Sequence, residues 1–182
     1  MLWETRLAGR GSGTNLAGMP QFLLASTFAT LALLVFLGTL VAVSVVDLHE
    51  QRIPDRILLP GCAAVFALLV AHAIAAGDAS RLANGLVAAT WGLAGSLLLH
   101  LIGRTSFGFG DVKLAGLIGL MAGWLSPAAA MVAVVAAFGG AGAVVVVLML
   151  LRRAGWSTRF AFGPFMALAA IATTAGAVIG AQ

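Results

Sequence analysis

Two aspartates have the surroundings best suited to chemistry in this 182-residue chain. Asp111 lies in the sequence GFGDVK (residues 108–113), at the head of an apolar run, and Asp47 closes an earlier apolar run. Two carboxylates brought close in a partly dry site do not easily both ionise, so one tends to keep a proton. The charged member can then take a proton from water as the water attacks an amide carbonyl, while the protonated member hydrogen-bonds the carbonyl oxygen.

The composition is that of a membrane protein. Hydrophobic residues make up 62% of the chain and charged residues only 9%, against about a quarter charged in soluble domains. An ionisable side chain in such a setting is costly, which indicates a function for Asp47 and Asp111. The ten Lys and Arg residues are spread among apolar runs, so the net positive charge predicts membrane orientation and no nucleic-acid partner. Cys62 is the single cysteine, and no spacing typical of a metal site is present, so we expect neither metal nor cofactor.

Apolar runs predict an all-α, polytopic membrane protein with about six transmembrane helices and short loops. We expect residues 1–20 to form a flexible tail and residues 21–182 to form one transmembrane domain. The polar segment 47–56 separates the first two helices, and its sequence Ile-Pro-Asp at residues 53–55 is expected to end the first. The predicted spans are residues 22–46, 57–76, 82–102, 112–124, 128–151 and 160–179.

The fourth of these runs is short. Its 13 residues cover roughly 20 Å as a helix, less than the roughly 30 Å thickness of the hydrocarbon layer. Asp111 is therefore expected at a helix N-terminus, slightly below the membrane surface, whereas Asp47 lies near a helix C-terminus. The helix dipole favours the anion at Asp111. Gly108 and Gly110 are expected to allow a tight turn and the approach of a substrate backbone to Asp111.

The basic residues predict the orientation of the six spans. Cytoplasmic loops carry an excess of Lys and Arg, and the loops after the first, third and fifth spans hold seven of the ten. Both chain ends are therefore expected outside, and Asp47 and Asp111 at the same cytoplasmic face. The seven residues are Arg52, Arg56, Arg104, Lys113, Arg152, Arg153 and Arg159.

Three segments resemble motifs of the type IV prepilin peptidases. The sequence DLHEQRIPD (residues 47–55) is similar to the family's first aspartate motif, GFGDVKL (residues 108–114) to its second, and FGPF (residues 162–165) to a run near its C-terminus. The resemblance extends over residues 22–180. It implies that Asp47 and Asp111 are catalytic, with no cofactor or metal, and that the remaining motif positions support them. Those positions are Ile53, Pro54, Asp55, Gly108, Gly110 and Lys113.

The resemblance also implies a reaction and a location. Such an enzyme is an aspartic endopeptidase of the bacterial inner (plasma) membrane. It cleaves the basic leader from a prepilin-like, single-span substrate protein at the cytoplasmic side, just before the substrate's apolar helix. Full-length members carry a cytoplasmic domain with cysteine pairs and also N-methylate the new pilin terminus. Here Cys62 is alone, so we expect no methyltransferase activity and a likeness to the minimal peptidases of tight-adherence (Flp-type) pili.

Three alternatives remain open at this point. A small transporter could use Asp47 and Asp111 as a proton or cation relay. A presenilin-type intramembrane protease shares the Gly-x-Gly-Asp pattern but places a tyrosine before its first aspartate, whereas Val46 precedes Asp47 here and the chain has no tyrosine. A structural assembly subunit would leave the polar segment 47–56 unexplained.

Several other side chains have competing interpretations. Lys113 is expected either to pair with a catalytic carboxylate or to extend to lipid headgroups. Glu50 and Asp55 either attract the basic residues of a leader or are ordinary solvated charges. Packing or interfacial roles are expected for His72 and His100. Gly119 and Gly123, four residues apart in the fourth run, are expected to permit close helix packing.

Overall fold

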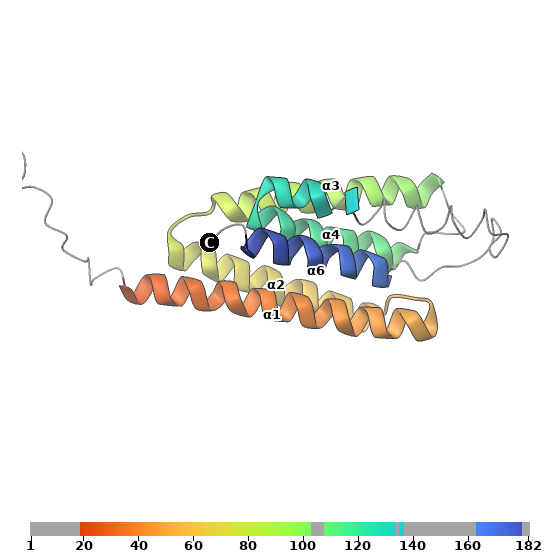
Figure 1. The fold of residues 1–182 in the computed structure, drawn as a ribbon, viewed down its shortest axis with the longest axis horizontal. Helices are drawn as coiled ribbons and strands as arrows, with labels where there is room; N and C mark the ends of the chain where they lie inside the picture. The colour runs from red at the N-terminus through yellow and green to blue at the C-terminus, as the bar shows by residue number, and fades with distance from the viewer. Residues whose placement is uncertain (1–18, 103–107, 134, 137–162, 180–182) are drawn as a thin grey trace, which may run out of the picture.

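Antiparallel helices run side by side along the long axis of the computed structural model, which describes residues 19–102, 108–133, 135–136 and 163–179 (Figure 1). Residues 127–133 and 135–136 are also helical, and no strand occurs in the described ranges. The predicted all-α class is confirmed. The helices with described bounds are α1 (Met19–Glu50), α2 (Asp55–Ala76), α3 (Ser80–Ile102), α4 (Phe109–Leu125) and α6 (Gly163–Ile179).

Three of these helices, α1, α2 and α3, are long and apolar enough to cross a membrane, and α6 is a shorter apolar helix. The first, second, third, fourth and sixth predicted spans each coincide with a described helix. Only the start of the fifth is described. Three predicted segments lie outside the described residues: residues 137–151 of that span, the basic segment 152–159 and residues 1–18 of the predicted tail.

The polar segment between the first two helices is shorter than predicted. Helix α1 continues past Asp47 to Glu50, and Gln51 then takes a left-handed conformation with φ 52°. Pro54 is extended, with φ −78° and ψ 122°, and α2 begins at the next residue. The sequence Ile-Pro-Asp at residues 53–55 therefore does not end the first helix, which stops three residues earlier. Continued helical hydrogen bonding satisfies backbone groups near the membrane, and only residues 51–54 connect the two helices.

The starts of α1 and α4 show smaller differences from the prediction. Met19 and Pro20, predicted in the tail, are the first residues of α1, where a proline is tolerated because the first-turn N–H has no helical partner. Helix α4 begins at Phe109, three residues before the predicted start, with Gly108 as its N-terminal cap. Asp111 therefore lies inside the first turn of α4.

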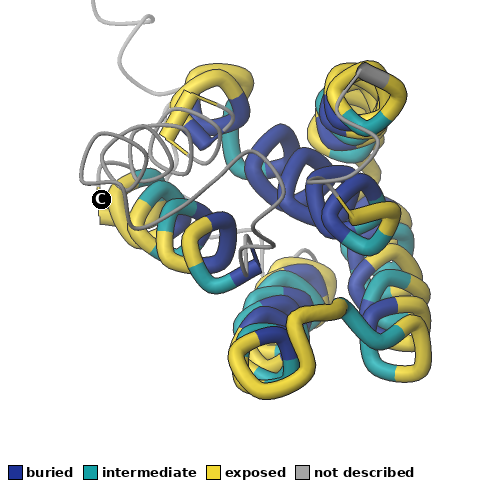
Figure 2. The backbone as a smooth tube through the Cα atoms, turned by 90° about the vertical axis from the view of Figure 1, so that its right-hand side faces the viewer, coloured by how far each residue is buried: buried dark blue, intermediate teal, exposed yellow. Residues whose placement is uncertain are grey.

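Helix α4 occupies the centre of the bundle. Thirteen of its 17 residues are buried, including an unbroken stretch from Leu114 to Trp124. Figure 2 shows this helix as a dark blue rod between the others. A helix that is hydrophobic all round is a buried one. The apolar composition of α4 thus reflects burial within the protein.

Glycines bring α3 and α4 into backbone contact. A Cβ on Gly92 of α3 would lie 2.7 Å from the carbonyl oxygen of Ala115, and one on Gly119 of α4 would lie 2.6 Å from that of Ala88. A Cβ on Gly123 would likewise lie 2.7 Å from the carbonyl oxygen of Asn84. The predicted packing role of Gly119 and Gly123 is confirmed, and α3 is the partner helix.

The five helices with described bounds form two helical hairpins and a helix that bridges them. Helices α1 and α2 pack extensively on each other, as do α3 and α4, while α6 contacts both α1 and α4. Direct contact between α1 and α4 is slight. The end of α1 and the starts of α2, α4 and α6 lie at the same end of the bundle, on the right in Figure 1.

Candidate active site

Asp47 lies one turn before the end of α1 and is only 4% exposed. Its Oδ2 accepts a hydrogen bond of 3.0 Å from the backbone N–H of Gly163, the first residue of α6. The first N–H groups of a helix have no partner within the helix and carry its positive dipole end. The start of α6 therefore supplies both a donor and a favourable field for the Asp47 carboxylate.

The space around this contact requires a glycine. A Cβ on Gly163 would lie 2.7 Å from Oδ2 of Asp47, closer than non-bonded atoms approach. Gly163 belongs to the segment FGPF (residues 162–165), of which residues 163–165 are described. The sequence had singled out this segment without a role, and the contact with Asp47 provides one.

Asp111 is the third residue of α4 and is 7% exposed. Its Oδ2 accepts the backbone N–H of Gly108 at 3.0 Å, and its own N–H donates to the carbonyl oxygen of Gly108 at 3.1 Å. This reciprocal arrangement caps α4 and fixes the carboxylate against the preceding backbone. The prediction that Asp111 stands at a helix N-terminus is confirmed.

Asp47 is in the last turn of α1 and Asp111 in the first turn of α4, so the structure brings the two aspartates to one end of the bundle (Figure 1). In both side chains a glycine N–H holds Oδ2. The described residues donate no hydrogen bond to the second oxygen of either carboxylate. No group of three or more His, Cys, Asp or Glu side chains that could hold a metal ion occurs within the described ranges. The local chemistry is that of a carboxylate pair.

Gly108 and Gly110 each have a close neighbour that the sequence did not suggest. Gly108 has φ −74° and ψ 148°, which any residue can adopt, and a Cβ there would lie 3.2 Å from Oδ2 of Asp111. A Cβ on Gly110 would lie 2.6 Å from the Cβ of Ile53. In the direction of a side chain, the space beside Gly110 is therefore filled by Ile53. The approach of a substrate backbone to Asp111 stays a prediction.

Lys113 pairs with a residue that the sequence did not suggest. Its Nζ lies 2.7 Å from both carboxylate oxygens of Asp55 at the start of α2. The predicted pairing with a catalytic carboxylate is wrong, because this bidentate contact uses a different acid. Nearby, Glu50 forms an exposed ion pair with Arg52, with Oε2 and Nε 3.1 Å apart.

A cleft of about 680 Å³ lies beside the aspartates. Its lining includes Val46 and Gly110, the sequence neighbours of Asp47 and Asp111, together with Phe109 and residues of segment 50–57. Both carboxylate and basic side chains face it.

The two histidines of the predicted spans, His72 and His100, have packing contacts, as expected. Nδ1 of His72 lies 2.9 Å from the carbonyl oxygen of Ala25, which links α2 to α1, and its ring meets Trp124 edge-on. The ring of His100 packs against Phe109, with centroids 5.9 Å apart.

Residues 34–141 match the type IV leader peptidase family. The matched region covers more than half of the chain and contains Asp47, Asp111 and the whole segment between them. The chain belongs to the type IV leader peptidase family. Comparisons with curated proteins and with solved structures found no match.

Membership of the type IV leader peptidase family supports a peptidase, and a leader peptidase function in general. Together with the apolar helices, it identifies a membrane protein. The prediction drawn from the motifs is thus confirmed at the level of the family, and the transporter alternative gains no support. The match ends at residue 141, before Gly163.

Proposed function

We propose that this leader peptidase is an aspartic endopeptidase in which Asp47 and Asp111 activate water. Its substrate is a prepilin-like, single-span precursor in the bacterial inner membrane, and cleavage removes the basic leader at the cytoplasmic face. The observation that carries the proposal is the pair of buried aspartates, supplied by separate hairpins, at one end of an apolar bundle. Burial of two acids costs free energy, and ionisable residues kept in an apolar setting in spite of that cost are as a rule functional.

The reaction proceeds by general acid–base catalysis. The ionised aspartate takes a proton from a water molecule as the water oxygen bonds to the carbonyl carbon of the scissile amide. The other aspartate, protonated, donates a hydrogen bond to the carbonyl oxygen and stabilises the developing negative charge. The aspartate that took the proton from water then passes it to the amide nitrogen, and the carbon–nitrogen bond breaks to leave a carboxylic acid and a free amine. The N–H groups of Gly163 and Gly108 hold one oxygen of each aspartate in place during these steps.

The surroundings of the pair suit a substrate that is half polar and half apolar. Large apolar side chains on the outer faces of α1 and α3 are exposed, as expected where a protein contacts lipid, among them Leu34 and Trp91. A substrate helix in the same bilayer would present the peptide just beyond its apolar segment at the level of the aspartates. The proposal includes no methyl transfer, since only residues 51–54 separate α1 from α2 and leave no room there for a cysteine-bearing domain.

The test is cleavage of a single-span precursor by the purified protein in lipid vesicles. We expect Asp47→Asn and Asp111→Asn each to lower the rate at least about 1,000-fold, as loss of one member of a catalytic unit does. The matched control is Asp78→Asn at the opposite end of the bundle. Asp78 accepts the N–H of Ser80, a contact that asparagine reproduces, so its rate should equal wild type. Full cleavage by either Asp47→Asn or Asp111→Asn would exclude the proposed mechanism.

A further inference from the structure

The two aspartates depend on contacts other than those between their own helices. Asp47 belongs to α1 and Asp111 to α4, and these helices belong to separate hairpins with slight direct contact. A water molecule shared by two carboxylates requires a separation controlled to a fraction of an ångström. Some other part of the chain must hold the end of α1 against the start of α4.

One such contact is steric. Ile53, in the connection that follows α1, fills the space left by the missing side chain of Gly110, the residue before Asp111. Ile53 is half-buried and packs against the hydrophobic core. The connection between α1 and α2 thus packs on the first turn of α4 through the contact of Ile53 with Gly110.

The second contact is ionic. Lys113, two residues after Asp111, places Nζ 2.7 Å from both oxygens of Asp55. The Lys113 side chain is 24% exposed and the Asp55 side chain 54% exposed. The lysine end of the pair is therefore partly shielded from solvent, and attraction there is stronger than between two fully exposed groups. The neighbouring pair of Glu50 and Arg52 is by contrast exposed on both sides, and such pairs contribute little.

We propose that residues 51–55 form a clamp that sets the separation of Asp47 and Asp111. The positioning residues of the active site are then Ile53, Asp55 and Lys113. Ile53 contacts the residue before Asp111, and Asp55 pairs with Lys113, two residues after Asp111. The clamp joins the hairpin that carries Asp47 to the hairpin that carries Asp111. This inference rests on the proposed function, because it assigns a role in the reaction of that carboxylate pair.

An electrostatic role for Lys113 on Asp111 fits the geometry less well. Residues two apart on a helix point to different faces, and the ammonium of Lys113 is engaged by Asp55. The contribution of Lys113 is therefore the ionic bridge from α4 to Asp55 of α2. A bridge with the two charges exchanged should hold the helices in the same way.

Charge exchange tests the ionic contact. We expect Lys113→Ala and Asp55→Asn each to lower kcat about 10- to 100-fold with little change in KM, since the substrate surface stays while the carboxylates lose their spacing. Asp55→Lys combined with Lys113→Asp restores the bridge in reverse and should return kcat to within about fivefold of wild type. Asp78→Asn, which removes a carboxylate charge at the opposite end of the bundle, is the matched control and should leave kcat unchanged.

The steric contact gives a second test that involves no charge. Gly110→Ala places a methyl group where Ile53 lies and should lower kcat about 10- to 100-fold. Ile53→Gly in the same chain removes the opposing Cβ and should recover most of that loss. This pair keeps the proposal testable even if the charge-exchanged protein does not fold.

Asp47→Asn and Asp111→Asn in the same assay separate the two ideas. If both are inactive while Lys113→Ala and Asp55→Asn keep the wild-type kcat, the clamp is wrong and the proposed function stands. If neither double variant improves on its single substitutions, the clamp is likewise wrong. If Asp47→Asn or Asp111→Asn cleaves at the wild-type rate, the proposed function fails and the clamp with it.

Discussion

Gly163 shows how closely a single residue constrains the site. Its N–H donates to Asp47, and the position of its missing Cβ is occupied by the same carboxylate. Any side chain at this position must push Asp47 away or shift the start of α6. The orientation of one catalytic candidate is therefore set by a residue 116 positions later in the chain.

Gly163→Ala should lower kcat about 10- to 100-fold, because it displaces Oδ2 of Asp47 by a sizeable fraction of an ångström. Gly176→Ala in the same helix is the matched control. A Cβ at Gly176 meets nothing within 4 Å, so this substitution should keep the wild-type kcat and stabilise α6 by up to about 1 kcal/mol. Equal rates for Gly163→Ala and wild type in the vesicle assay would show that the contact is not needed.

The sequence allowed the two aspartates to be predicted at one face, because each stands at the edge of an apolar run. The contacts that surround them were not predictable in the same way. Gly163 reaches Asp47, and Lys113 reaches Asp55, only through the packing of distant helices. The sequence predicted that Gly110 leaves space for a substrate backbone. Only the fold shows that Ile53 lies where a side chain at position 110 would be.

At the scale of elements, the contact between α3 and α4 supports the helix that carries Asp111. Small residues allow helices to approach until their backbones touch, which is a main source of association between helices in a membrane. Gly92 and Gly119 both face carbonyl oxygens of the opposite helix. The position of α4 in the bundle therefore depends on these glycines.

Gly119→Ala should destabilise the fold by about 1–3 kcal/mol, as expected when an extra methyl group is forced into a packed interface. Gly95→Ala on α3 is the control, since a Cβ there meets nothing within 4 Å. It should leave stability unchanged or raise it by up to about 1 kcal/mol. Unfolding in mixed detergent micelles measures both, and a Gly119→Ala protein as stable as wild type would contradict the close packing described for α3 and α4.

Hydropathy predicted the existence of the helices better than their ends or surroundings. An apolar run indicates a helix that avoids water, but it does not distinguish a helix that faces lipid from one enclosed by protein. Helix α4 was predicted as a short span and is the buried centre of the bundle. The polar residues 47–50 looked like a loop, yet they continue α1 because backbone hydrogen bonding outweighs their weak local preference.

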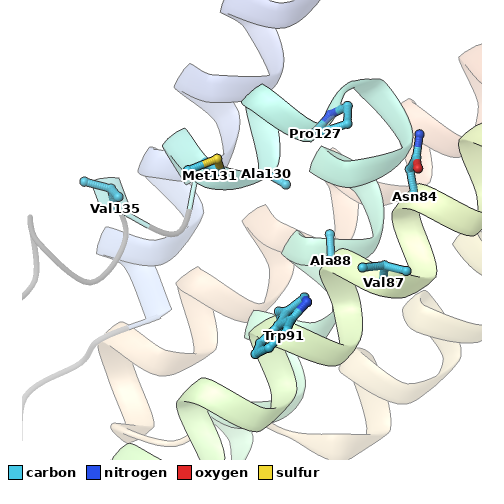
Figure 3. A pocket seen from close by; sticks show the side chains of 8 residues that line it. All are labelled: Asn84, Val87, Ala88, Trp91, Pro127, Ala130, Met131 and Val135. Atoms are coloured by element: carbon cyan, nitrogen blue, oxygen red, sulfur yellow. The ribbon is translucent and has the colours of Figure 1, made fainter.

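At the scale of the whole molecule, the carboxylate pair and the connection 51–54 share one end of the bundle (Figure 1). The turn between α2 and α3, with Asp78, lies at the other end. Between α3 and residues 127–131 lies an apolar groove of about 390 Å³, whose lining includes Trp91 and Met131 (Figure 3). The 32 residues of α1 extend about 48 Å, more than the roughly 30 Å of a hydrocarbon layer. Helix α1 is therefore long enough to reach both membrane surfaces.

The proposed orientation predicts which end meets the cytoplasm. With Cys62→Ser as background, Glu50→Cys should react with a membrane-impermeant maleimide only in inverted membrane vesicles. Asp78→Cys should react only in intact spheroplasts. The excess of basic residues on the side of the carboxylate pair is the physical reason. The opposite labelling pattern would place the active site outside the cytoplasm.

The central claim is that Asp47 and Asp111 act as one unit. Single-turnover cleavage of the precursor by Asp47→Asn, Asp111→Asn and the double variant tests it most directly, because losses within a catalytic unit are strongly non-additive. We expect the double variant to be as slow as the slower single variant, within about threefold. Losses that multiply in the double variant, or wild-type cleavage by either single variant, would contradict a shared function of the two aspartates.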